Sequence, residues 1–227
     1  MSMIRISPLI FGLFFVFSVP FGSRAQIKLG VSGGPSLSFT RVLSALDSLD
    51  ARPGPVAFGF RMDMLMEVPL TERYSFVTGL NYISKGRNVE FLRTLPDQDR
   101  PESRIDEHRL QYIGTKATLR LHTDDIGPTL GLRFFLEGGP QMYIKTSDRP
   151  VPFKKKDSEV QSFFPVDLNL LVTGGVELDF GVETSLFTGF SYQHIPHDVD
   201  SRTRNFPSRA DLYLREGTFS LIIGIKF

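Results

Sequence analysis

Eight stretches of alternating apolar and polar residues, joined by connections that are in turn long and short, constrain the fold of this 227-residue chain most. A period of two places one set of side chains on each face of a β-strand. The stretches are Ile27–Phe39, Pro55–Val68, Arg73–Lys85, His108–Leu121, Thr129–Lys145, Pro165–Leu178, Glu183–His194 and Gly217–Phe227. The alternating connections are typical of membrane barrels with long loops at one rim and tight turns at the other. The sequence therefore predicts an all-β fold, an eight-stranded antiparallel up-and-down transmembrane β-barrel.

The last stretch, Gly217–Phe227, has the reach of a transmembrane strand, which needs about 9–11 residues. Its odd-numbered positions from Phe219 to Phe227 are apolar and share one face, whereas Lys226 lies on the other. We expect it to close the barrel against Ile27–Phe39, with its apolar face toward lipid.

The connections are predicted to be loops, and both ends of the barrel would then lie at the tight-turn rim, on the periplasmic side. The long loops are Thr40–Gly54, Gly86–Glu107, Thr146–Phe164 and Ile195–Leu214, and the short turns are Pro69–Glu72, His122–Pro128 and Asp179–Val182. Pro140 argues against an ordinary central strand at its position, or marks a bulge.

Charges of both signs lie on the faces opposite the apolar residues. Those assigned to the lumen are Arg61, Asp63, Glu67, Lys116, Arg120, Glu137, Glu177 and Lys226. The periodicity alone does not say which face is inside, and a soluble barrel would have its apolar face there. Eight strands leave an interior just wide enough for side chains, and an unpaired buried charge costs several kcal/mol. We therefore expect the basic and acidic members to pair in the lumen, in a structural role that closes the barrel.

The first 25 residues resemble a secretory signal peptide. Arg5 supplies the positive charge, Leu9–Val19 is a short apolar core, and small residues precede the predicted cleavage between Ala25 and Gln26. A membrane anchor is the alternative, but the apolar core is too short for one. The predicted division is a signal peptide at 1–25 and an outer-membrane barrel domain at 26–227.

Composition excludes several classes of protein. A net charge of +1 gives no electrostatic argument for nucleic acid. The absence of Cys excludes disulfides, thiolate metal sites and a lipoprotein anchor. A mean hydropathy of -0.05, without a long apolar run beyond the N-terminus, excludes a helical membrane protein.

Tyrosines lie near the ends of several predicted strands, where membrane barrels carry aromatic girdles. Tyr82, Tyr143, Tyr192 and Tyr213 lie near the long-loop ends and Tyr74 near a short-turn end. The girdle interpretation competes with the general frequency of Tyr in strands.

Clusters that suggest chemistry are weak. The histidine pair His194 and His197, with Asp198 next to it, resembles a metal-binding cluster, but it lacks a third ligand of fixed spacing. A solvated loop is therefore favoured, and no metal or cofactor is predicted. Ser191 and His194 lie on opposite strand faces, so no catalytic set is predicted either. The run 154–156 of three lysines could bind lipopolysaccharide phosphates or an acidic partner, although such runs are usually solvated.

Glycine-rich patterns at five strands carry a resemblance to a known family. They are Gly30–Gly34, Gly79–Gly86, Leu136–Pro140, Gly174–Leu178 and the closing Gly224–Phe227. With them the chain resembles the PorT-like small outer-membrane β-barrel proteins of Bacteroidota. The resemblance implies insertion by the outer-membrane assembly machinery, with Phe227 as part of the signal, and one member of that family supports protein export through the gliding-associated secretion system.

The sequence thus predicts a monomeric, non-enzymatic protein of the cell outer membrane. Its partners would be outer-membrane lipid, the assembly machinery, and secretion or surface proteins that contact the long loops. The role would be structural or partner-binding, or accessory to protein secretion. The alternative is a soluble exported barrel that binds a small apolar ligand, as lipocalins do. A conducting pore is disfavoured because the lumen is narrow and charged.

Overall fold

A computed structural model describes residues 26–44, 50–93, 102–126, 131–150, 160–162, 166–180, 184–195, 199–203 and 211–227. Within these residues the chain forms eight long strands and three short ones. The long strands are β1 (Lys28–Ser44), β3 (Ala57–Pro69), β4 (Tyr74–Arg93), β5 (Glu102–His122), β6 (Leu132–Pro150), β8 (Val166–Phe180), β9 (Thr184–His194) and β11 (Asp211–Lys226). The short ones are β2 (Asp50–Pro53), β7 (Val160–Ser162) and β10 (Val199–Thr203). The predicted signal peptide lies outside the described residues.

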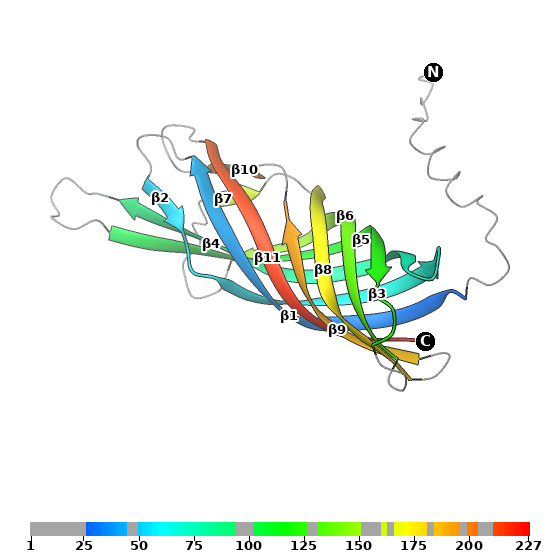
Figure 1. Ribbon diagram of the computed structural model, residues 1–227. Coiled ribbons are helices and arrows are strands. Elements are labelled where there is room, and N and C mark those ends of the chain that lie inside the picture. Colours follow the sequence, from blue (N-terminus) through cyan, green and yellow to red (C-terminus); the bar gives the residue numbers. More distant parts are fainter. Residues whose placement is uncertain are drawn as a thin grey trace, which may run out of the picture.

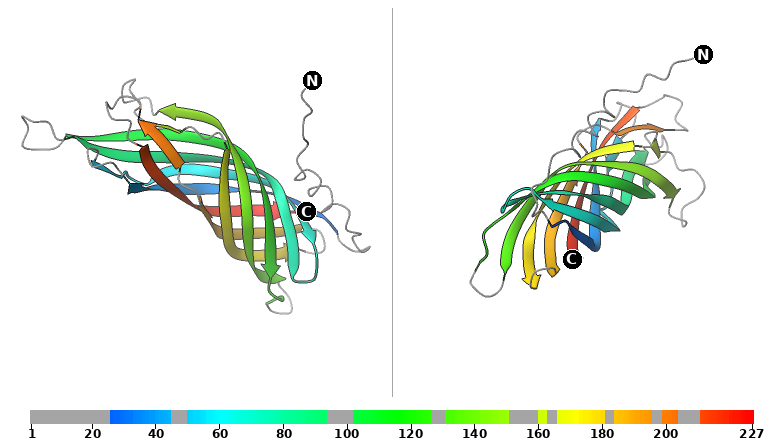
Figure 2. Two further views of the ribbon diagram at one scale, coloured as in Figure 1. Left: turned by 90° about the horizontal axis from the view of Figure 1, so that it is seen from above. Right: turned by 90° about the vertical axis from the view of Figure 1, so that its right-hand side faces the viewer.

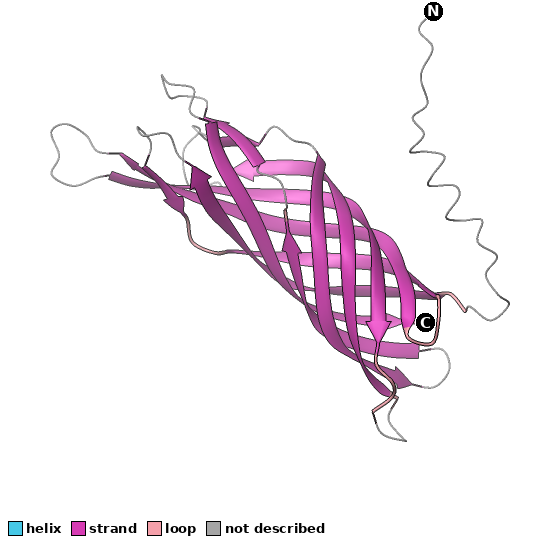
Figure 3. Ribbon diagram, turned by 45° about the horizontal axis from the view of Figure 1, so that its top comes forward, coloured by secondary structure: helices cyan, strands magenta, loops and turns pink. Residues whose placement is uncertain are grey.

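Each long strand pairs antiparallel with the next long strand along the chain, and β1 pairs with β11 to close a barrel (Figure 1). The closing ladder runs from Gly30 opposite Lys226 to Ser44 opposite Tyr213. Figure 3 shows the resulting tilted wall of strands. The predicted eight-stranded, antiparallel, up-and-down barrel is confirmed, as is the pairing of the terminal strand with β1.

The barrel is apolar outside and polar inside. Along β3, Phe58, Met62 and Met64 are 78%, 57% and 65% exposed on the outer face. The residues between them, such as Arg61 and Asp63, are buried in the lumen. A soluble barrel would show the reverse pattern, because apolar surface leaves water on folding. An outward apolar face around a polar interior is instead the pattern of a barrel that crosses a membrane.

Five strands continue far into segments predicted as loops. β4 and β5 are 20 and 21 residues long, about twice the length that a bilayer needs. They remain paired from Tyr74 opposite Leu121 to Arg93 opposite Glu102, and the hairpin reaches beyond the rest of the barrel at the rim away from the C-terminus (Figure 2). β1, β6 and β11 also extend into these segments, and β2, β7 and β10 lie within them. The loop prediction was wrong there because the backbone N–H and C=O groups of polar residues pair across a ladder as well as those of apolar residues.

Pro140 lies within β6, opposite Leu170 of β8, on the outer face. The β5–β6 ladder has no registered pair at Ala117 and Thr118, where Pro140 and Gly139 would face them, but the register is the same on both sides of this gap. The irregularity that shifts the register lies elsewhere, between Gln111 and Tyr112. Pro140 therefore lies in a central strand whose ladder with β5 is interrupted beside it, so the strand is not ordinary here, as expected; the register does not shift as a bulge would require, and that alternative was wrong.

No helix in the described part of the chain is long and apolar enough to cross a membrane.

Candidate functional site: the lumen charge network

The eight charged residues predicted for the lumen all point into it, because each occupies an inward position of its strand. They come from β3 (Arg61, Asp63, Glu67), β5 (Lys116, Arg120), β6 (Glu137), β8 (Glu177) and β11 (Lys226), and none is more than 5% exposed. Charges that are so far from solvent need partners.

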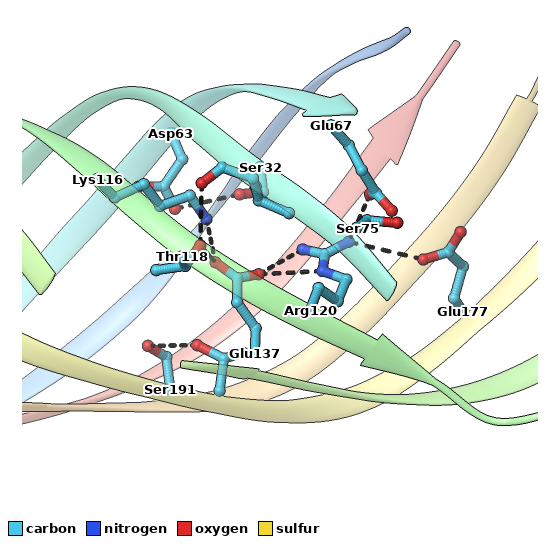
Figure 4. Close-up of polar contacts among 12 residues, drawn as sticks. Ser32, Asp63, Glu67, Ser75, Lys116, Thr118, Arg120, Glu137, Glu177 and Ser191 are labelled. Atoms are coloured by element: carbon cyan, nitrogen blue, oxygen red, sulfur yellow. Dashed lines mark hydrogen bonds and ion pairs between the residues drawn. The ribbon is translucent and has the colours of Figure 1, made fainter. Parts of the chain in front are cut away.

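Arg120 lies at the centre of the network (Figure 4). Its Nη1 donates to Glu67 Oε2 at 3.0 Å, and its Nη2 donates to Glu137 Oε2 at 2.6 Å. Its Nε donates to the same oxygen of Glu137 at 3.1 Å, and Glu177 lies 3.7 Å from Nη1. One guanidinium thus links carboxylates from three other strands, which suits the fixed fork of arginine donors.

Two lysines complete this network. Lys116 Nζ donates to Glu137 Oε1 at 2.6 Å, and Lys226 Nζ donates to Glu67 at 2.7 Å and to Glu177 at 2.5 Å. Among these six residues three cations face three carboxylates, so their formal charges balance, and Arg133 of β6 also reaches Glu177 at 3.4 Å. The network joins β3, β5, β6, β8 and β11 across the lumen.

A second ion pair lies apart from the first network. Arg61 Nε donates to both oxygens of Asp63, at 2.9 and 2.8 Å. Asn81 and Ser32 also donate to this carboxylate, and Arg61 Nη1 reaches Ser191 Oγ at 3.1 Å. The carboxylate of Asp63 thus receives donors from three strands.

An apolar layer surrounds Arg120. The rings of Phe135 and Phe187 meet edge to face, with centroids 6.2 Å apart. The Arg120 guanidinium carbon lies 4.6 Å from the first ring centroid and 5.5 Å from the second, in the range of cation–π contacts. Leu65, Val77 and Ile222 belong to the same buried cluster. The lumen is thus filled by packed apolar side chains as well as by ion-paired ones.

Close packing extends to the backbone of β11. The phenyl ring of Phe187 covers Gly224, its directly opposite partner. A Cβ at Gly224 would also lie 2.6 Å from Ser32 Cβ and from the Val31 carbonyl oxygen. Only a glycine fits here, because a Cβ would displace the ring or the wall.

We predict that Gly224→Ala lowers the free energy of unfolding by about 1–3 kcal/mol, the usual cost of overpacking. Urea titration of the barrel in lipid vesicles measures it. Gly174→Ala is the matched control, since a Cβ there meets its nearest atom at 4.0 Å. Equal stabilities of the two variants would contradict the packing argument.

Sequence reasoning missed His122, which it placed in a turn. His122 is the buried end of β5, and its Nε2 lies 3.0 Å from Glu67 Oε1. Glu67, His122 and Glu177 offer ligand atoms within 4.8 Å of one another. Lys226 donates to both carboxylates, however, and a metal ion would have to displace its ammonium group. The donor set therefore suits ion pairing better than metal binding.

A further polar cluster near the long-strand rim was also missed. Arg87 of β4 donates to Glu216 of β11, and both are buried. Lys85 Nζ lies 5.0 and 5.4 Å from the ring centroids of Tyr112 and Tyr143. The signal was the inward alternation of Lys85 and Arg87, which continues past the predicted end of the strand.

Tyr143 is not part of an aromatic girdle. It is fully buried in the lumen, where its hydroxyl donates to Gln141 Oε1 at 3.3 Å. The girdle prediction was therefore wrong for this residue, which alternates with outward Met142 and Ile144. Tyr74 is exposed on the outer face, and the side chain of Tyr213 lies outside the described part.

The weaker chemical candidates separate in space. Ser191 is buried in the lumen, whereas the ring of His194 stacks on Tyr192 with centroids 6.3 Å apart. They do not form a nucleophile–base pair. His197, Asp198 and the lysine run 154–156 lie outside the described residues.

The inside-out pattern and the closed antiparallel wall define a transmembrane β-barrel of an outer membrane. Residues 18–194 match a family described as the outer membrane protein beta-barrel domain, and the chain belongs to this family. The protein accordingly lies in the cell outer membrane, as predicted. The alternative of a soluble lipocalin-like barrel was wrong.

A solved structure of an outer-membrane protein shows the same fold. The outer membrane protein OprG from Pseudomonas aeruginosa aligns with a TM-score of 0.53 and 8% identity, over 89% of this chain and 97% of that one. Neisserial surface protein A aligns with a TM-score of 0.45 and 16% identity, over 88% and 97%. Among curated proteins, none matches the chain in sequence.

Proposed function

We propose that this protein is a closed, non-enzymatic barrel that acts through its extended outer rim. The lumen network holds the wall together and blocks passage of solutes, and the long hairpin of β4 and β5 presents a binding platform outside the membrane. Both parts of the proposal follow from the division of the strands into a plugged membrane segment and a projecting sheet.

The observation that carries the proposal is the continuous pairing of β4 with β5 beyond the membrane. Lys85 opposite Leu110 lies near the rim, and eight further registered pairs lead to Arg93 opposite Glu102. β2 adds to the same sheet through Asp50 opposite Leu92. A hairpin on its own is marginally stable, whereas a third strand stabilises it. The extension is therefore an ordered surface suited to a partner.

The test replaces residues 89–106 with an Asn-Gly turn, which closes Asn88 and Glu107 into a two-residue hairpin. The shortened barrel should still assemble, which heat-modifiable gel migration measures. It should fail to restore the wild-type phenotype when it is expressed in a deletion strain. Full complementation by the shortened protein would contradict a role for the hairpin.

The lumen part is tested separately by planar-bilayer recording of the purified protein. We expect no large, stable conductance, because eight strands leave room only for side chains and these are paired. Stable open steps from the native protein would contradict closure.

The finer assignment to the PorT-like proteins of Bacteroidota, with an accessory role in protein secretion, is a second proposal. It rests on the glycine patterns of β1, β4, β6, β8 and β11, which all lie in the barrel wall. Comparison of the secreted proteins of a deletion strain with those of the parent tests it, and an unchanged set would rule it out.

Assembly is proposed to follow the usual route of outer-membrane barrels. Residues 1–25 would be removed as a signal peptide before Gln26, and residues 26–227 would insert as a monomer through the assembly machinery. Phe227 would be part of the recognition signal. Its backbone exchanges hydrogen bonds of 2.8 and 2.9 Å with Leu29, and its side chain is exposed on the outer face.

A further inference from the structure

The seam between β1 and β11 closes the barrel, but no turn connects these two strands directly (Figure 1). In a hairpin the turn fixes the register, whereas this seam joins the first long strand to the last. A slip of one residue would turn the apolar side chains of a strand into the lumen, but a slip of two would preserve both faces. Side chains must therefore select the register at this seam.

The hydroxyl pairs in the middle of the seam do not make this selection. Ser36 lies opposite Ser220 and Ser38 lies opposite Thr218, and all four side chains are buried in the lumen. After a slip of two residues, Ser38 would face Ser220, or Ser36 would face Thr218, so small hydroxyl groups would still meet. The selection must come from larger side chains.

On the outer face, an aromatic side chain of β1 crosses the seam. Phe39 lies opposite Gly217 of β11, and its ring covers this glycine so closely that a Cβ there would overlap it. Beyond the glycine, the ring stacks on Tyr192 of β9, with centroids 6.5 Å apart and planes at 5° to each other. Phe39 thus joins three strands, which is possible because Gly217 has no side chain.

On the inner face, a side chain of β11 crosses the seam in the other direction. Lys226 lies opposite Gly30 of β1, and its ammonium group donates to Glu67 of β3 at 2.7 Å. A Cβ at Gly30 would lie 2.9 Å from Lys226 Cγ and 2.6 Å from the Ile225 carbonyl oxygen. This glycine therefore leaves the path of the lysine open, as the glycine on the outer face does for the phenyl ring.

We propose that Phe39 and Lys226 act as two straps that set the register of the closing seam. The straps run in opposite directions, on opposite faces and near opposite ends of the β1–β11 ladder. After a slip of two residues neither strap would have a glycine beneath it. The residues then opposite would be Phe219 or Arg215 for Phe39, and Ser32 or Lys28 for Lys226.

A slipped register would therefore lose both contacts at once. It would lose the aromatic stacking on Tyr192, and it would leave Glu67 buried with one cation fewer. The inference depends only on the closed barrel, and it is independent of the proposed function of the hairpin.

The test traps each register with a disulfide, since the chain has no cysteine of its own. Ser38→Cys with Thr218→Cys reports the observed register, in which the two hydroxyl oxygens lie 3.3 Å apart. Ser38→Cys with Ser220→Cys reports one slipped register, and Ser36→Cys with Thr218→Cys reports the other. Each protein is refolded into lipid vesicles under an oxidant. Heat-modifiable migration identifies the folded fraction, and mass spectrometry of its digest measures the yield of each disulfide.

In the parent sequence, the disulfide of the observed register should exceed either slipped one by at least about tenfold. Phe39→Ala combined with Lys226→Gln should lower this ratio by about tenfold or more, because both straps are lost. If this combination does not fold, the outer strap is tested alone. Phe39→Ala and Gly217→Ala should each lower the ratio, and combining them should lower it no further, because both remove the same contact.

Leu37→Ala is the matched control. Leu37 belongs to the same outward row of β1, where it lies opposite Phe219 and not opposite a glycine. Its truncation removes apolar contacts of the seam but no strap, so the ratio of the disulfides should remain that of the parent.

Two results would overturn the proposal. One is an unchanged disulfide ratio in the folded strap variants, which would mean that other contacts select the register. The other is an equal fall of the ratio in Leu37→Ala, which would indicate a general loosening of the seam.

Discussion

Replacement of Arg120 by methionine is expected to lower the free energy of unfolding by about 3–5 kcal/mol. The variant keeps much of the side-chain length but removes the only guanidinium that contacts both Glu67 and Glu137 in the described structure. These carboxylates would remain buried with fewer cations to offset them, and breaking a buried ion pair costs more than the pair contributes when intact. The loss of the contacts with Phe135 and Phe187 adds a smaller cost.

The measurement is equilibrium unfolding by urea in lipid vesicles, followed by heat-modifiable migration. Arg73→Met is the control, because its pair with Asp124 is exposed and should contribute no more than about 1 kcal/mol. Combining Arg120→Met with Glu137→Gln removes one carboxylate along with the cation, so that the formal charges balance again, and it should recover part of the loss. A cost below about 1 kcal/mol for Arg120→Met would mean that water reaches the network and that the lumen is not closed.

The wall of the barrel could be predicted from the sequence because it depends on local alternation alone. The faces of Phe58, Met62 and Met64 followed from the period of two, as did the inward position of Arg61. The choice between lumen and exterior did not follow from periodicity. It came from the mixed charges on one face, which only a membrane barrel can place inside.

The contacts of the site could be predicted only in part. Pairing of Arg120 with Glu137 follows from their inward positions on adjacent strands, which the register places directly opposite. The contact of Lys226 with Glu67 passes over β1, between strands that are not direct neighbours in the barrel wall, so it depends on side-chain reach. No local pattern encodes that distance.

Strand ends were the least predictable feature. A bilayer sets a minimum length for a strand but no maximum. The polar residues from Arg87 onward were therefore interpreted as a loop, although a strand can continue beyond the membrane. The pairing of β4 with β5 outside the membrane depends on register, which continues once the hairpin has formed. His122 was missed for the same reason, since it lies one residue past the predicted end of β5.

Replacement of Met62 by arginine is expected to destabilise the barrel by about 2–4 kcal/mol, the cost of a cation at the bilayer midplane. Met62 is 57% exposed and lies at the centre of the outward row that runs along β3 from Phe58 to Met66. Methionine makes no ion pair that the substitution could break, so the cost would arise from placing the arginine guanidinium against lipid. In water the same exposed substitution would be nearly neutral.

Phe58→Arg is the matched control on the same strand. Phe58 is 78% exposed at the end of the row nearest the long-strand rim, where an arginine can reach the headgroups and should cost about 0–1 kcal/mol. Both variants are compared by urea unfolding in vesicles of one lipid composition. A difference of 1 kcal/mol or more between them would locate the bilayer centre near Met62. Equal small effects would mean that this face is not surrounded by lipid. That would contradict the position in the membrane inferred from the apolar outer face and the polar lumen.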